Sequence, residues 1–136
     1  MYHTGYCRFA GIMKKLNGIK KIAVKVDTQA GTLYSQLAET MPGCKKIIVE
    51  PGITAYLLPD GTTIELYSHG AVYPEFLFAA SDAVLSFKVQ NVDYVLQDLQ
   101  KAGGELIGQV IQACSSYRFC YVRVNERSTI GLFEEN

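Results

Sequence analysis

The stretch DAVLSFKVQNVDYVLQDLQKAGGELIG, residues 82–108, holds a strand, a helix and the start of a second strand without a gap. Its first residues alternate between two faces, which is the period of a β-strand, and one face carries Leu85, Phe87 and Val89. Apolar residues then recur at helical spacing, at Val92, Val95, Leu96 and Leu99. Gly103 and Gly104 end the helix, since paired glycines suit a left-handed cap and a tight turn. The stretch is one strand–helix–strand unit, and a weaker copy of it lies earlier in the chain.

The composition is that of a folded protein with an ordinary core. The chain has 136 residues, 49% of them hydrophobic, and a mean hydropathy of +0.08. It is long enough for one compact domain, or for two small modules that share a sheet. The charges of thirteen basic and thirteen acidic residues cancel, so the protein has no net positive charge that would attract a polyanion. We therefore expect no nucleic-acid partner.

Nothing in the sequence predicts export or membrane insertion. No run is apolar enough to span a bilayer, and the first residues lack the pattern of a signal peptide. The four cysteines are spread out without a CxxC pair, which favours reduced thiols. We therefore expect a soluble cytoplasmic protein with no membrane partner. Residues 1–18 are predicted to form a loosely ordered extension, and both Met1 and Met13 fit as the native start.

The first unit is predicted over residues 19–67. Residues 19–26 alternate as a half-buried strand, and Asp27 or Thr28 caps a helix over residues 28–40. A modest apolar stripe marks this helix, formed by Leu33, Leu37 and Met41. Turn residues then separate three strand candidates, at 46–50, 53–58 and 62–67. The order of elements is βαβββ.

The second unit repeats this order over residues 83–136, after a connection at 68–82 that shows no sustained period. After its first strand and helix, alternating residues predict three more strands, at 105–112, 116–124 and 129–134. Matching pentapeptides support a duplication: TIELY at 63–67 matches TIGLF at 129–133, and IAVKV at 22–26 matches LSFKV at 85–89. We therefore predict an α+β fold of two βαβββ modules within one domain.

The sequence resembles the vicinal oxygen chelate superfamily, which includes glyoxalase I, bleomycin-resistance proteins and dihydroxybiphenyl dioxygenases. The resemblance covers residues 19–134 and rests on three pieces of sequence: PDGTTIELY, LSFKVQNVDYVLQDLQKAGGELIG and YVRVNERSTIGLFEE. It implies curved mixed sheets that enclose a cavity, helices on the outside, and a homodimer. Whether the two modules pair within one chain or between two chains stays open.

The resemblance also implies where a metal would bind. Metal-dependent members place a ligand, usually His, Gln or Glu, near the start of the first strand of each module, and a Glu within the last strand. The matching positions here are Lys21, Glu65, Val84 and Gly131. Only Glu65 has a suitable donor atom, because an ammonium group has no lone pair and valine and glycine side chains offer no donor. If the alignment with the family is shifted by one residue, only Lys20, Ala83 or Ser86 takes a ligand position. We therefore predict no metal and no cofactor.

Glu65 needs another partner if the metal is absent. Strand alternation places Lys21 on the same face of the sheet as Glu65, so we predict an ion pair where two ligands would otherwise lie. In the alternative, both side chains reach solvent at the rim and do not meet. Separation of the ammonium nitrogen and the carboxylate beyond the reach of a bridging water would refute the pair.

Aromatic residues at strand spacing are candidates for the wall of the cavity. Together with Lys21 and Glu65, the predicted ligand-binding residues are Tyr67, Phe119, Tyr121, Arg123 and Phe133. Aromatic residues at this spacing also occur as plain core. The candidates for a catalytic acid or base are Glu65, Lys21 and His69, although a histidine in a connection is also typical of a surface residue. Cys120 is predicted to face the helix side as a small apolar residue.

Three functions are consistent with these patterns. The first is a metal-free protein that holds a small organic ligand in an aromatic-lined cavity, as bleomycin-resistance proteins do. The second is a glyoxalase-like lyase, isomerase or dioxygenase with an atypical metal site or with acid–base catalysis through Glu65, Lys21 or His69. The third is a dimeric structural module whose own side chains fill the cavity. The sequence contains no Ser/His/Asp or Cys/His constellation and no phosphate loop, so we favour the first.

Overall fold

Two modules with the predicted order βαβββ make up the fold, and the computed structural model describes residues 16–135. The first module consists of β1 (Leu16–Lys25), α2 (Thr28–Glu39), β2 (Lys45–Glu50), β3 (Ile53–Leu57) and β4 (Thr63–Tyr67). The second consists of β5 (Ala83–Val89), α3 (Val92–Lys101), β6 (Glu105–Cys114), β7 (Tyr117–Asn125) and β8 (Ser128–Glu135).

The first strand begins earlier than the sequence predicts. Most of the predicted extension lies outside the described residues, but its last part, from Leu16, already belongs to β1. The register between β1 and β5 shifts in this part, and Gly18 there has a φ of +92°. Such a bulge interrupts the alternation of side chains, which is why the strand pattern is visible only from Ile19 onward.

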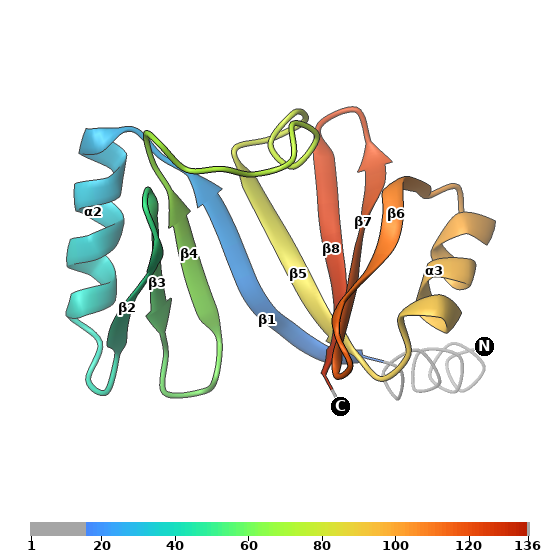
Figure 1. Ribbon diagram of the computed structural model, residues 1–136, viewed down its shortest axis with the longest axis horizontal. Helices are drawn as coiled ribbons and strands as arrows, with labels where there is room; N and C mark the ends of the chain where they lie inside the picture. The colour runs from blue at the N-terminus through green and yellow to red at the C-terminus, as the bar shows by residue number, and fades with distance from the viewer. Residues whose placement is uncertain (1–15, 136) are drawn as a thin grey trace, which may run out of the picture.

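The strands form one mixed sheet in the order β2-β3-β4-β1-β5-β8-β7-β6, which does not close into a barrel. The first and last strands of each module are parallel neighbours, β1 with β4 and β5 with β8. An antiparallel pair, β1 with β5, joins the modules, so both halves of one chain share the sheet. Figure 1 shows α2 and α3 at opposite outer sides of it. We call the face turned away from the helices the inner face. The predicted α+β fold is confirmed.

The helix of the second module packs as the sequence predicts. Its cap is Asn91, which accepts a hydrogen bond from the Tyr94 N–H at 3.0 Å. Its apolar stripe is buried against β7 and β8, in a cluster formed by Val92, Val95, Leu96, Cys120, Val122 and Leu132. Gly103, with a φ of +103°, ends the helix. Cys120 therefore faces the helix side, and its burial raises the pKa of the thiol to about 11.

The helix of the first module packs through small residues instead. Ala38 is buried, and a Cβ at Gly31 would touch the Val26 side chain at 3.5 Å. The predicted stripe is wrong, because Leu33 and Leu37 are 62% and 59% exposed. A helix this close to the sheet admits only small side chains on its packed face. Neither of the two helices in residues 16–135 has the length and apolar character to cross a membrane.

The connection at 68–82 forms no helix or strand and lies against the inner face. Its Leu77 and Phe78 are 2% and 8% exposed, and they pack on Ala23 of β1 and Val84 of β5. Figure 1 shows it running from the end of β4 across to the start of β5. The chain itself thus fills part of the inner face, along the junction of the two modules.

Candidate functional site

Lys21 and Glu65 form an ion pair on the inner face. β1 and β4 run parallel with Ala23 opposite Glu65, so Lys21 lies one diagonal step away on the same face. The distance from Lys21 Nζ to Glu65 Oε2 is 3.6 Å, and the two side chains are 30% and 15% exposed. The predicted pair is confirmed, and the alternative in which the two side chains do not meet is wrong.

Glu65 has a second partner in Tyr67, two residues further along β4. The Tyr67 hydroxyl donates a hydrogen bond to Glu65 Oε1 at 3.0 Å. Burial, and then the negative charge of Glu65, raise the pKa of Tyr67 above its ordinary value, so the hydroxyl keeps its proton. Each oxygen of the carboxylate therefore has one partner, Lys21 on one side and a neutral donor on the other.

Lys21 lies over two aromatic rings of the second module. Its Nζ is 5.9 Å from the ring centroids of both Tyr117 and Phe133, and 3.5 Å from the Tyr117 hydroxyl. Burial on its own would lower the pKa of Lys21, but the charge of Glu65 and the contact with Tyr117 outweigh it and raise the pKa. Lys21 is therefore a fixed cation at neutral pH, and its nitrogen is not a free nucleophile.

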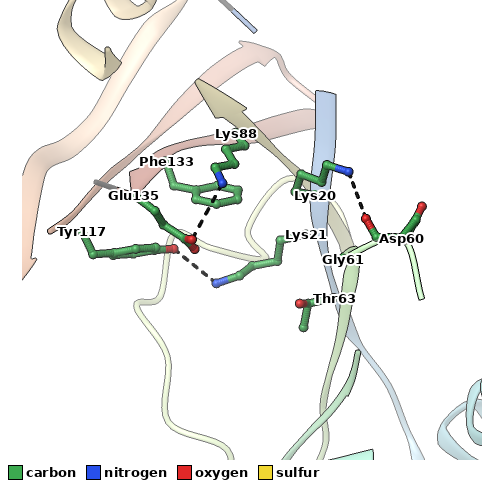
Figure 2. Close-up of a pocket in the computed structure, with 9 residues that line it drawn as sticks. All are labelled: Lys20, Lys21, Asp60, Gly61, Thr63, Lys88, Tyr117, Phe133 and Glu135. Atoms are coloured by element: carbon green, nitrogen blue, oxygen red, sulfur yellow. Dashed lines mark hydrogen bonds and ion pairs between the residues drawn. The ribbon is translucent and has the colours of Figure 1, made fainter. Parts of the chain in front are cut away.

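A pocket of about 430 Å³ opens beside Lys21, and both modules contribute to its wall. We call it the Lys21 pocket; Figure 2 shows its lining residues, which are Lys20, Lys21, Asp60, Gly61, Thr63, Lys88, Tyr117, Phe133 and Glu135. Lys20 Nζ donates to the carbonyl oxygen of Asp60 at 3.2 Å, and Lys88 Nζ lies 3.9 Å from Glu135 Oε2. Ammonium groups beside aromatic rings suit a carboxylate on an apolar body.

A metal ion does not fit the positions that the resemblance implies. Val84 is fully buried in the apolar cluster under the connection, and Gly131 has no side chain and lies close to Ser86, so neither position offers a donor atom. In the first module, the ammonium group of Lys21 already holds the carboxylate of Glu65. Residues 16–135 contain no group of three or more His, Cys, Asp or Glu side chains that can hold a metal.

The aromatic residues predicted for the wall lie on the inner face, but they differ in their distance from the pocket. Phe133 lines it. Phe119 is not among the lining residues, but its ring contacts that of Tyr117, with centroids 5.6 Å apart. Tyr121 packs beneath the connection, where burial raises its pKa to about 12. The Lys21 pocket thus has an aromatic wall, and the other predicted aromatic residues pack elsewhere on the inner face.

Arg123 and His69 are not among the residues that line the Lys21 pocket. Arg123 Nε donates to Thr129 Oγ1 at 3.3 Å, so this cation is used inside the second module. His69 is exposed and lines a separate pocket of about 530 Å³, together with Lys25 and Tyr67. The structure therefore does not bring His69 together with the ion pair.

Sequence reasoning missed several lining residues, among them Lys20, Lys88 and Tyr117. Tyr117 precedes Phe119 by two residues on β7, so the alternation that identified Phe119 was a sufficient signal. Alternation does not predict the position of Lys20, because this residue lies at a shift in register between β1 and β5. A bulge of this kind turns a side chain toward a face that strict alternation does not give it.

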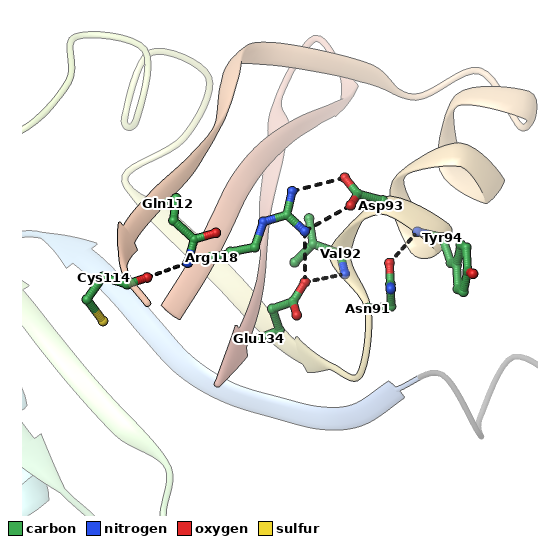
Figure 3. Close-up of polar contacts among 8 residues, drawn as sticks. All are labelled: Asn91, Val92, Asp93, Tyr94, Gln112, Cys114, Arg118 and Glu134. Atoms are coloured by element: carbon green, nitrogen blue, oxygen red, sulfur yellow. Dashed lines mark hydrogen bonds and ion pairs between the residues drawn. The ribbon is translucent and has the colours of Figure 1, made fainter. Parts of the chain in front are cut away.

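A second polar cluster, shown in Figure 3, lies around the start of α3. Glu134 Oε1 accepts a hydrogen bond from the Val92 N–H at 2.9 Å and lies 3.3 Å from Arg118. Arg118 also binds both oxygens of Asp93, at 2.8 and 3.2 Å. These contacts use all the charges of the cluster to fix α3 on β7 and β8, which indicates a structural role.

No protein-family model matches the chain, and no curated protein matches it. Several solved structures do. Methylmalonyl-CoA epimerase from Mycobacterium tuberculosis matches with a TM-score of 0.58 and 16% identity, over 90% of this chain and 91% of that one. A glyoxalase/bleomycin resistance protein/dioxygenase superfamily member from Vibrio splendidus 12B01 matches with a TM-score of 0.57 and 12% identity, over 89% and 99%.

A third structure is 2,2',3-trihydroxybiphenyl 1,2-dioxygenase from Sphingomonas wittichii strain RW1. It matches with a TM-score of 0.62 and 12% identity, over 89% of this chain but only 41% of that chain. At these levels of identity the likeness is one of fold, and it extends over both modules.

Proposed function

Since the chain has the fold of the vicinal oxygen chelate superfamily but lacks a ligand set at the matching positions, we propose that it binds a small organic anion without a metal. The site is the Lys21 pocket, and the ligand is a carboxylate on an apolar body. Such a protein holds or sequesters its ligand, and it needs no catalytic group.

The placement of Lys21 carries this proposal. An ammonium group has three hydrogens to donate; Lys21 donates one to the Tyr117 hydroxyl, and its charge is paired with Glu65 at 3.6 Å. A ligand carboxylate can accept one of the other hydrogens without displacing Glu65. An aromatic body then lies against Tyr117 and Phe133, which already face the pocket.

Calorimetric titration with benzoate tests the site. The variant Lys21→Met keeps the apolar stem of the side chain and removes its charge, so it should weaken benzoate binding by about 10-fold or more. Lys25→Met is the matched control, because Lys25 lies on the same strand but outside this pocket. Equal loss in both variants, or no saturable binding of benzoate and related aromatic carboxylates, contradicts the proposal.

Metal analysis of protein purified without a chelator tests the other half of the proposal. We expect no stoichiometric metal, because an ammonium group and a glycine stand at two of the four implied positions. Zinc, nickel, iron or manganese at one equivalent per chain would show that the site is metal-dependent after all.

One observation favours a second candidate, a dimeric structural module with a filled cavity. Leu77 and Phe78 occupy the inner face where the modules join, as a self-filled cavity requires. This candidate predicts a homodimer by light scattering after size exclusion, and no thermal shift with any small acid. A cytoplasmic location and a homodimer are also part of our main proposal, so only ligand binding separates the two. An acid–base role for Glu65 stays a prediction.

A further inference from the structure

The segment at 72–81, which we call the lid, has no backbone hydrogen bond to the sheet among the described residues. Its own backbone bonds are local, from the Leu77 N–H to the Pro74 carbonyl and from the Ala79 N–H to the Phe76 carbonyl. Backbone attachment to the sheet resumes only beyond its ends, where the Lys25 N–H binds the Asp82 carbonyl at 2.7 Å. The lid is therefore held in place by its side chains.

At the end of the lid the Ser81 hydroxyl accepts a hydrogen bond from the Ala83 N–H at 3.2 Å, and the other side chains that hold the lid are apolar or aromatic. Phe78 and Tyr73 lie against the Tyr67 ring, with centroids 5.2 and 5.8 Å away. Phe76 lies against Tyr121, with centroids 5.9 Å apart. Leu77 is buried over the junction of the two modules. Contacts of this kind are non-directional, so another apolar group of similar size can replace them.

The floor beneath the lid has an apolar centre, and it adjoins the Lys21–Glu65 ion pair on the inner face. Ala23 and Val84 form its centre, and Ala23 follows Lys21 by two residues on the same face of β1. Tyr67 joins the two regions, since its ring touches the lid while its hydroxyl binds Glu65. The inner face therefore has a cationic end at Lys21 and an apolar end that the lid covers.

We propose that the lid is displaceable, and that the floor beneath it takes the apolar chain of an amphipathic carboxylate whose head group binds at Lys21. This inference rests on the proposed function and names the ligand class more closely. A short acid binds at Lys21 and leaves the lid in place. A long-chain acid inserts its tail between the lid and the floor, and it takes over the contacts of Leu77 and Phe78.

A chain-length series tests the lid in the wild-type protein. Acetate, hexanoate and decanoate share one head group and differ only in the apolar tail. We expect affinity to rise steeply from hexanoate to decanoate, and hydrogen exchange at residues 72–81 to speed up by roughly 10-fold with decanoate only. Benzoate, which fits the Lys21 pocket, should leave this exchange unchanged.

Two lid variants provide the matched comparison. Phe78→Ala removes a contact with the floor, so the open state becomes more populated and decanoate should bind about 5- to 10-fold more tightly. Val72→Ala is the control, because Val72 belongs to the lid but is 79% exposed. It should leave decanoate binding unchanged. Acetate binding should be the same in both variants and in the wild type.

The outcomes separate this inference from the proposed function. Binding of benzoate that depends on Lys21, with no gain from hexanoate to decanoate, overturns the lid and leaves the proposed function intact. The same holds if decanoate binds while exchange at residues 72–81 stays unchanged. Failure of every carboxylate to bind overturns the proposed function, and the lid with it.

Discussion

The two modules share one backbone plan but carry opposite chemistry on the inner face. The first presents Lys21 and Glu65 at its two matched positions, and the second presents Val84 and Gly131. Both strand pairs are parallel and in the same order. The same backbone plan therefore accommodates a charged pair at these positions in one module and an uncharged pair in the other.

The largest effect on stability should come from adding a side chain at Gly131 in the second module. Gly131→Ala places a Cβ against Ser86 Oγ, so we expect a loss of about 2–3 kcal/mol in the free energy of unfolding. Urea unfolding followed by circular dichroism measures it. Adding Ser86→Ala removes the overlapping atom and should restore most of the loss. A double variant as unstable as the single one would mean that close packing is not what requires glycine.

The next largest effect on stability should come from removing the charges of Lys21 and Glu65 in the first module. Lys21→Met and Glu65→Leu each leave one half-buried charge unpaired, and each should cost about 1–2 kcal/mol in the free energy of unfolding. The double variant makes the first module resemble the second and should return close to wild-type stability. Thermal and urea unfolding of all four proteins give the coupling energy. Simple addition of the two single losses would show that the side chains act independently.

A smaller effect should appear at alkaline pH, where groups of both modules titrate. The pKa values of Lys21 and Tyr67 are raised from ordinary values of 10.5 and 10.0, so folding favours the protonated form of each. Their contribution is complete below the ordinary values and is lost as the pH rises through the folded values. The pKa of Cys120 in the second module is raised in the same way, from 9.0 to about 11, so the free energy of unfolding should fall above about pH 9. Tyr67→Phe should make the fall shallower, and an unchanged slope would contradict it.

The smallest effect is expected at a core position where the modules also differ. Tyr56 is fully buried, and its hydroxyl has no hydrogen-bond partner among the described residues, whereas the matching position of the second module is Val122. Tyr56→Phe removes a polar group that gains nothing, so unfolding should change by less than about 0.5 kcal/mol, or shift toward greater stability. A clear loss would show that the hydroxyl has a partner, such as a buried water.

The parts of the molecule that the sequence predicted are those governed by local period. The stripe of α3, its glycine end and the alternation of β1 and β4 are local features, and the last of these was enough to predict the pairing of Lys21 with Glu65. The packed face of α2 cannot be predicted from the local sequence pattern. It depends on how closely the helix approaches Val26, which favours Ala38 over the larger Leu37.

The composition of the site was harder to predict for a similar reason. The lid is a stretch without period, so the sequence gives no sign of which of its residues meet the sheet. Arg123 fits the alternation of its strand, but the hydrogen bond that it donates to Thr129 depends on tertiary contacts that the alternation does not reveal. Tyr117, by contrast, was within reach of the alternation rule, and it forms part of the wall beside Lys21.

The contact between Glu134 and the start of α3 also bears on how the chain acquires its structure during synthesis. The acceptor for the Val92 N–H lies 42 residues further along the chain. A ribosome must therefore have translated beyond Glu134 before this helix can gain its tertiary cap. The start of α2 has only a local cap, since Asp27 accepts a hydrogen bond from the Ala30 N–H three residues away, whereas α3 has a local cap at Asn91 and this distant one as well. The start of α3 is therefore fully fixed only after the last strand has been made.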